Sequence, residues 1–176
     1  KSYLLNLSKE HNLKVFSIWD SHIKEIDHYD IFFLGFQKNP FKYIAKSTVF
    51  AFPSLWEGFP NALVEAMICK TPVMASDCKS GPREILAPNT DYHSNPDSVE
   101  LAKYGVLMPV CDGRFFSAED PLTMEENIWA EALIKFLNDE NLRESYRKSA
   151  SIRAADFSAD RIIGDWLNII NNLSSG

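Results

Sequence analysis

The sequence has 176 residues, of which 45% are hydrophobic and 24% charged, with a formal net charge of -6 from 18 Lys and Arg against 24 Asp and Glu. This composition is typical of a globular chain, and an acidic total without a Lys/Arg cluster disfavours nucleic-acid binding. No apolar run reaches the roughly 18 residues of a membrane span. The chain opens with Lys1, shows no signal-peptide pattern and ends in Ser-Ser-Gly, so we expect a piece of a longer protein.

Short apolar runs alternate with helical patterns along the first two thirds of the chain. The runs are rich in β-branched and aromatic residues and nearly continuous, as in strands buried on both faces. We expect parallel strands at 15–19, 31–34, 48–52, 72–75 and 106–110, and helices at 40–45, 60–69 and 82–86. This order predicts an α/β fold, a Rossmann-like parallel sheet with flanking helices.

The last third of the chain is predicted to be helical, at about 125–173. Residues 127–138 carry one apolar stripe, and a final helix with Ser158 as its N-cap carries another. Both stripes are expected to be core, because their polar faces lack the Lys/Arg excess of membrane-surface helices. Residues 87–103 are polar and predicted to be a surface excursion. We expect residues 1–176 to form a single domain.

Cysteine and histidine spacing predicts no metal site. Cys69, Cys78 and Cys111 are odd in number and fit no paired ligand spacing, and the four histidines are scattered in polar segments. Small buried thiols are the favoured interpretation. Such cysteine usage fits a reducing cytoplasm.

The segment 52–67 carries the most informative pattern. A predicted strand ends there, Glu57 and Gly58 follow in a loop, and Pro60 stands where a first helical residue is expected. The unpaired amides of that first turn would suit a phosphate. Glu65 has no oppositely charged residue three or four positions away on the helix. Its carboxylate either binds a ligand or lies on a solvated helix face, two interpretations that spacing alone leaves open.

Segment 52–67 resembles the E-x7-E signature of glycosyltransferase family 4, the group 1 retaining enzymes of GT-B architecture. Four further blocks stand in the family's order, at 31–35, 45–54, 71–75 and 104–109, and Ser80 to Leu86 resembles the family's loop after the next strand. The resemblance covers about residues 31 to 115. It implies that the chain is the C-terminal, donor-nucleotide-binding half of a two-domain enzyme.

The resemblance also implies a role for each matching residue. Glu57 would hold donor-sugar hydroxyls and count as catalytic, while Glu65 would bind the ribose hydroxyls. For Arg83 and Glu84, shaping the loop is favoured over touching the donor. The remaining donor-binding positions are Gly58, Phe59, Pro60, Asn61, Ala62 and Leu63, whose backbone would face the sugar and diphosphate, and Phe36, Gln37 and Lys38 would frame the base.

The implied reaction is retaining transfer of a hexose or N-acetylhexosamine from a nucleotide sugar, with a UDP-sugar expected. The implied acceptor is a glycan or lipid-linked glycan in bacterial surface polysaccharide synthesis, without cofactor or metal. An N-terminal domain would bind the acceptor, and an Arg and a Lys upstream would clamp the diphosphate, so this chain alone is expected to be inactive. The parent is expected in the cytoplasm, touching the inner face of the membrane only peripherally.

Two departures and three alternatives accompany the resemblance. Lys70 stands where relatives often have Gly, a strained choice if its backbone is left-handed, and Pro60 replaces a common Gly. A dinucleotide-binding domain lacks support because no G-x-G occurs, and a metal-dependent transferase because no D-x-D occurs. A non-catalytic nucleotide-sugar-binding or regulatory module stays open.

Overall fold

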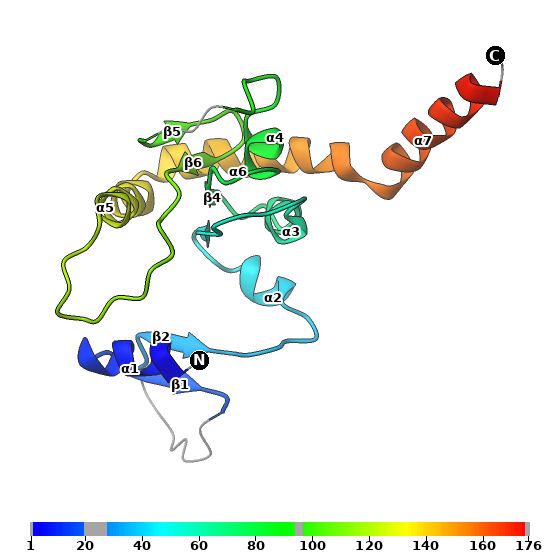
Figure 1. Ribbon diagram of the computed structural model, residues 1–176. Helices are drawn as coiled ribbons and strands as arrows, with labels where there is room; N and C mark the ends of the chain where they lie inside the picture. The colour runs from blue at the N-terminus through cyan, green and yellow to red at the C-terminus, as the bar shows by residue number, and fades with distance from the viewer. Residues whose placement is uncertain (1, 20–27, 94–96, 175–176) are drawn as a thin grey trace. The chain divides into compact units, whose positions relative to one another are not determined.

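The computed structural model describes residues 2–19, 28–93 and 97–174. The chain divides into two compact units (Figure 1). Unit 1 comprises Lys1–Pro40 with Arg114–Leu122, and unit 2 comprises Phe41–Gly113 with Thr123–Gly176. That the whole chain acts as one donor-binding domain stays a prediction.

Unit 1 is a small parallel pair of strands with one helix. Strands β1 (Val15–Ser17) and β2 (Ile31–Phe33) pair in parallel, as predicted, although each is shorter than its apolar run. Helix α1 (Ser2–Glu10) was not predicted. The hydroxyl of Tyr3 donates to the Phe116 carbonyl and accepts from the Phe116 amide, which fixes segment 114–122 to α1.

Unit 2 is built on a four-stranded sheet. Strands β3 (Phe50–Phe52), β4 (Val73–Ser76) and β6 (Val106–Met108) are parallel, and with β5 (Glu100–Leu101) they form a sheet in the order β3-β4-β6-β5. The predicted α/β fold with a parallel sheet and flanking helices is therefore confirmed. Strand β5 (Glu100–Leu101) pairs antiparallel with β6, so the surface excursion predicted for 87–103 is wrong at this point. Two residues make too short a run to produce a strand pattern.

The helices of unit 2 follow the predicted order, with α6 and the 3-10 turn η1 as additions. Helix α5 begins before its apolar stripe because Thr123 and Glu126 form a capping box. The largely polar helix α6 lies within the range 125–173 predicted to be helical, but no separate helix was predicted at its position. The elements are α2 (Phe41–Ile44), α3 (Asn61–Ile68), α4 (Pro82–Leu86), α5 (Met124–Asn138), α6 (Glu140–Ala154), the 3-10 turn η1 (Ala155–Phe157) and α7 (Ala159–Ser174).

Two hydrophobic clusters form the core, one on each face of the sheet. Val73 and Ala75 of β4 lie in a cluster with buried residues of α3, α4 and α6, whereas Met74 lies in the other with α5. Successive residues of a strand point to opposite faces. Both faces are therefore covered, which explains why β4 and β6 are nearly continuous apolar runs.

The two C-terminal apolar stripes differ in burial. Ala132 and Phe136 of α5 are buried, as predicted. No described residue of α7 is buried, and Trp166 in its stripe is 62% exposed. The prediction that this second stripe is core is therefore wrong for the described chain, because the large apolar side chains of α7 are exposed. Among the described residues no helix is both long and apolar enough to cross a membrane.

Candidate donor-binding site

The loop that carries Glu57 is joined to the loop that follows the neighbouring strand. Glu57 comes after β3 and is partly buried, and its amide donates to the Lys79 carbonyl at 3.1 Å. Its carbonyl accepts from the Ser80 amide at 2.8 Å. Strands β3 and β4 are parallel neighbours, so both loops lie at the carboxyl edge of the sheet, where α/β folds bind ligands.

Gly81 makes this junction close. Its φ is +76°, and a β-carbon added there would lie 2.3 Å from the Gly58 carbonyl oxygen and 2.5 Å from Cδ of Pro60. Only glycine combines this conformation with such an approach. The loop at Glu57 and Gly58 and the loop at residues 79–81, more than twenty residues apart in the sequence, thus lie in close contact.

The start of α3 leaves few amides free. Pro60 is the N-cap and not, as was predicted, the first helical residue, because the helix begins at Asn61. Its carbonyl accepts from the amides of Leu63 and Val64 at 3.0 and 3.4 Å, and Asn61 donates to Phe59. The expectation of a whole first turn of unpaired amides is therefore wrong.

Three amides of the predicted donor-binding segment remain available. In the described part of the chain, those of Gly58, Phe59 and Ala62 have no hydrogen-bond acceptor. Gly58 and Phe59 are also exposed. Backbone amides near a helix N-terminus attract anionic oxygens. This short run can therefore donate to a diphosphate.

Glu65 lies in the second turn of α3 and is partly buried. Among the described residues its carboxylate has neither an ion pair nor a hydrogen bond. Burial, and then the charge of Glu65, raise the pKa of the Cys69 thiol one turn later. The backbone that carries Glu65 is fixed by its buried helix neighbours, among them Val64 and Ala66.

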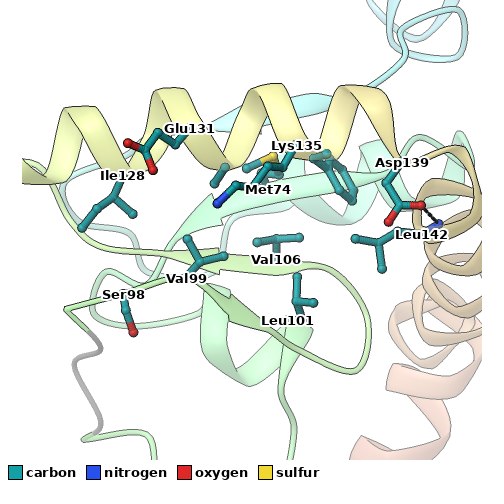
Figure 2. A pocket seen from close by; sticks show the side chains of 12 residues that line it. Met74, Ser98, Val99, Leu101, Val106, Ile128, Glu131, Lys135, Asp139 and Leu142 are labelled. Carbon is teal, nitrogen blue, oxygen red and sulfur yellow. Dashed lines mark hydrogen bonds between the residues drawn. The ribbon is translucent and has the colours of Figure 1, made fainter.

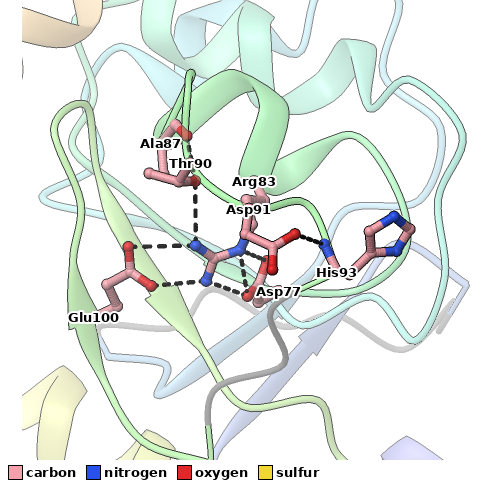
Figure 3. Close-up of polar contacts among 7 residues, drawn as sticks. All are labelled: Asp77, Arg83, Ala87, Thr90, Asp91, His93 and Glu100. Carbon is pink, nitrogen blue, oxygen red and sulfur yellow. Dashed lines mark hydrogen bonds and ion pairs between the residues drawn. The ribbon is translucent and has the colours of Figure 1, made fainter.

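Arg83 is buried among protein partners. It is 5% exposed, and its Nε donates to both carboxylate oxygens of Asp77, at 3.0 and 2.8 Å. Its Nη2 donates to Glu100 at 2.7 Å, and its Nη1 lies 3.4 Å from the hydroxyl of Thr90 (Figure 3). These contacts favour the loop-shaping role for Arg83, while Glu84 beside it is exposed.

Ionisation in this loop follows from burial and pairing. Burial alone would lower the pKa of Arg83, but hydrogen bonds to Asp77 and Glu100 outweigh it and raise that pKa. Burial, then the charges of Glu57 and Asp77, raise the pKa of the Cys78 thiol. Cys78 is therefore a protonated buried thiol, although its neighbours in the sequence are polar, whereas Cys69 and Cys111 are only partly buried.

Sequence reasoning missed the partners of Arg83 and those of Phe59. Asp77 lies two residues after the strand predicted at 72–75, which was a usable signal, but Glu100 lies on the unpredicted β5. Phe59 packs edge-to-face on Phe157 of η1, with ring centroids 5.3 Å apart. Nothing in the polar α6–η1 sequence indicated that contact.

The predicted base loop belongs to unit 1. Phe36 is 91% exposed, and the side-chain amide of Gln37 donates to the Leu34 carbonyl at 2.6 Å. Lys38 is exposed. Gly35 has φ +59°, and a β-carbon there would lie 2.9 Å from Cζ2 of Trp19. Glu57 and Glu65 belong to unit 2.

A hollow of about 560 Å3 lies between the sheet and α5, away from the Glu57 loop (Figure 2). Met74, Val106 and Leu101 of the sheet line it together with Ile128 and Lys135 of α5. None of the predicted donor-binding residues lines this hollow. The candidate site is instead an open edge of the sheet, defined by its loops.

Comparisons with known proteins agree with the motif. The family model for group 1 glycosyl transferases matches residues 13–105. An uncharacterized glycosyltransferase of Methanocaldococcus jannaschii is 41% identical over 144 residues, which are 80% of this chain and 35% of that protein. An N-acetylgalactosamine-N,N'-diacetylbacillosaminyl-diphospho-undecaprenol 4-alpha-N-acetylgalactosaminyltransferase of Campylobacter jejuni is 32% identical over 84% of this chain and 34% of its own length. The chain thus spans about a third of the length of these curated relatives.

Two solved structures share the fold. Sucrose-phosphate synthase of Thermosynechococcus elongatus matches 99% of this chain and 34% of its own, with a TM-score of 0.63 and 21% identity. The crystal structure of TarM matches 81% of this chain and 24% of its own, with a TM-score of 0.57 and 24% identity. Both support the predicted GT-B half-fold. With its family model matching more than half of its residues, the chain belongs to the group 1 glycosyl transferases.

Proposed function

We propose that this chain is the donor-binding part of a retaining glycosyltransferase that uses a UDP-sugar. The transferred group is a hexose or an N-acetylhexosamine, and the acceptor is a glycan or lipid-linked glycan of a bacterial surface polysaccharide. The observation that carries the proposal is the junction of the Glu57 loop with the 77–81 loop at the carboxyl edge of the sheet. This junction presents the free amides of Gly58 and Phe59 and the carboxylate of Glu57 directly before helix α3, which carries Glu65.

The proposed division of labour follows from chemistry. A sugar nucleotide already has a good leaving group, so the main requirement is to stabilise charge on the departing diphosphate. The amides of Gly58, Phe59 and Ala62 supply part of this stabilisation, and no metal or other cofactor is invoked. Glu57 orients the donor sugar by binding the sugar's hydroxyls, and Glu65 binds the hydroxyls of the ribose.

The remaining parts of the reaction are assigned to the longer protein. The acceptor binds to a domain outside these 176 residues, and that domain also contacts the cytoplasmic face of the membrane. With nothing to position an incoming hydroxyl, this chain by itself transfers no sugar. The similarity to the Campylobacter jejuni transferase, whose name states a diphospho-undecaprenol acceptor, supports a lipid-linked substrate.

The test is a titration of the 176-residue chain with UDP by isothermal calorimetry. Glu65→Gln should weaken UDP binding by about 1–3 kcal/mol, the cost of losing a charged hydrogen-bond acceptor. Glu131→Gln is the matched control, because it makes the same change at an exposed glutamate of α5. Unchanged UDP affinity in a folded Glu65→Gln variant would refute the ribose role, and a wild-type chain that binds no nucleotide would refute the proposed function.

A further inference from the structure

The buried residues Asp77 and Arg83 and the partly exposed Glu100 form a cluster, here named the Arg83 clasp, that closes a loop. Asp77 directly follows β4, and its amide donates to the Met108 carbonyl of β6 at 2.8 Å. Arg83 lies in α4, so its ion pair with Asp77 brings together the two ends of segment 78–82. Glu100 of β5 binds the same guanidinium. The loop is therefore fastened to the edge of the sheet through one side chain.

The middle of that loop holds the backbone of Glu57. Lys79 and Ser80 make the two hydrogen bonds to Glu57, and Gly81 packs on Gly58 and Pro60. All of these contacts lie between the two residues that the clasp joins. A shift of segment 78–82 would therefore move the Glu57 loop, including its free amides.

Glu65 is held in a different way. It lies within α3, whose buried residues Leu63, Val64, Ala66 and Met67 belong to the hydrophobic core. Helix packing, rather than the 78–82 loop, thus fixes its position. The two glutamates depend on separate supports.

We propose that the Arg83 clasp is a positioning device that sets the Glu57 loop for the sugar portion of the donor. This inference rests on the proposed function and extends it to Asp77, Arg83 and Glu100, none of which touches the donor. A buried ion pair is a poor source of stability, because desolvation offsets much of the attraction, so positioning is a better reason for its presence. Loosening the clasp should weaken sugar recognition while leaving nucleotide binding through Glu65 intact.

The test compares UDP with UDP-glucose, UDP-galactose and the two UDP-N-acetylhexosamines, each titrated into the 176-residue chain. The readout is the ratio of the Kd for UDP to the Kd for the tightest UDP-sugar. The main variant is the double change Asp77→Asn with Arg83→Met, which leaves no unpaired charge buried. Glu100→Gln is a milder second variant, and Glu57→Ala shows the effect of losing the carboxylate itself.

Arg143→Met is the matched control. Arg143 is also buried, at 6% exposure, but its guanidinium donates to the Phe136 carbonyl at 2.7 Å and to Glu140, away from the Glu57 loop. In the double variant the ratio should fall about tenfold towards one, the loss expected for a charged hydrogen bond. UDP binding should weaken by a smaller factor, because the Gly58 and Phe59 amides shift with the loop while Glu65 keeps its place in the packed helix α3. Arg143→Met should change neither quantity.

Hydrogen exchange provides a readout that needs no ligand. The amides of Glu57 and Ser80 should exchange faster in both clasp variants and at the wild-type rate in Arg143→Met. Unchanged exchange, an unchanged ratio, or an equal loss for UDP and UDP-sugar would each overturn the positioning role. If the wild-type chain bound no nucleotide, the proposed function would fail, and exchange would still decide whether the clasp holds the Glu57 loop.

Discussion

At the scale of single residues, Gly81 imposes the strictest requirement in unit 2. Its left-handed backbone and its approach to the Gly58 carbonyl leave no space for a β-carbon. Gly81→Ala should therefore lower the free energy of unfolding by about 2–4 kcal/mol, because backbone strain and overpacking add. Urea denaturation measures this loss.

The matched control for this substitution is Gly58→Ala. A β-carbon at Gly58 meets no atom within 4 Å. It should therefore change stability by less than about 0.5 kcal/mol, as expected for an unconstrained surface position. Equal losses at Gly58 and Gly81 would contradict the close approach described for Gly81.

Residue-scale prediction from the sequence succeeded where chemistry and order along the chain were sufficient. The spacing of Glu57 and Glu65 located a loop and the following helix, and the structure has both there. The contacts of Arg83 could not be predicted in the same way. Glu100 is 17 positions away on a two-residue strand, and only the folded sheet brings it to the guanidinium.

At the scale of elements, α3 ends in a left-handed lysine at a position where relatives often have glycine, as the sequence indicated. Lys70 has φ +59°, the left-handed conformation suspected from its position. The Thr71 amide donates to Ala66 and the Lys70 amide to Met67, both at 3.0 Å, which is a Schellman motif. Lys70→Gly should stabilise the chain by about 0.5–1 kcal/mol, since glycine relieves the strain of a left-handed residue.

Thermal denaturation would measure this gain, with Lys70→Ala as the control. Alanine removes the long side chain but keeps the strained β-carbon, so it should give no comparable gain. A Lys70→Gly variant no more stable than Lys70→Ala would show that the strain at this position is negligible.

Helix α6 shows why some elements escaped prediction. Its buried positions are Arg143, Tyr146, Ala150 and Ala154, which lie three or four residues apart. Two are alanines and one is charged, so the buried face forms no apolar stripe in the sequence. Packing of small residues against α3, rather than a hydrophobic pattern, defines this helix.

Tyr146 of α6 predicts a pH dependence. Its hydroxyl donates to the Ala102 carbonyl at 3.0 Å, and burial raises its pKa to about 12. The folded pKa exceeds the unfolded value of about 10, so the stabilising contribution is complete below pH 10 and is lost as the pH rises through 12. The shift corresponds to about 2–3 kcal/mol at full loss.

Comparison of wild type with Tyr146→Phe isolates this effect. At pH 8 the variant should be about 1 kcal/mol less stable, because it lacks the hydrogen bond. Phenylalanine does not ionise, so the deficit should shrink and then reverse between pH 10 and 12. Urea denaturation across this range measures it, with Tyr92→Phe, at an exposed tyrosine, as the control. A constant deficit at every pH would contradict the raised pKa.

At the scale of the whole molecule, the sequence predicted the sheet and its flanking helices but not what covers each apolar stripe. The stripes of α5 and α7 look alike in the sequence, yet only that of α5 is covered in the described chain. An apolar stripe shows that one face of a helix favours burial. It carries no information about which surface provides that burial.

This difference predicts the effect of removing α7. Taken together, the two hydrophobic clusters draw on the sheet, α2, α3, α4, α5, α6 and η1, and no described residue of α7 takes part. A chain that ends at Ser158 should therefore keep its thermal midpoint within about 2 °C, since little apolar area is lost from the core. Ending at Asp139 removes the buried Tyr146, Ala150 and Ala154 and should abolish cooperative unfolding. Large exposed apolar patches promote association, so the full chain should associate as its concentration rises in sedimentation velocity, and the chain ending at Ser158 should not. A large drop in thermal midpoint on removing α7 alone would show that its apolar face contributes to the fold of unit 2.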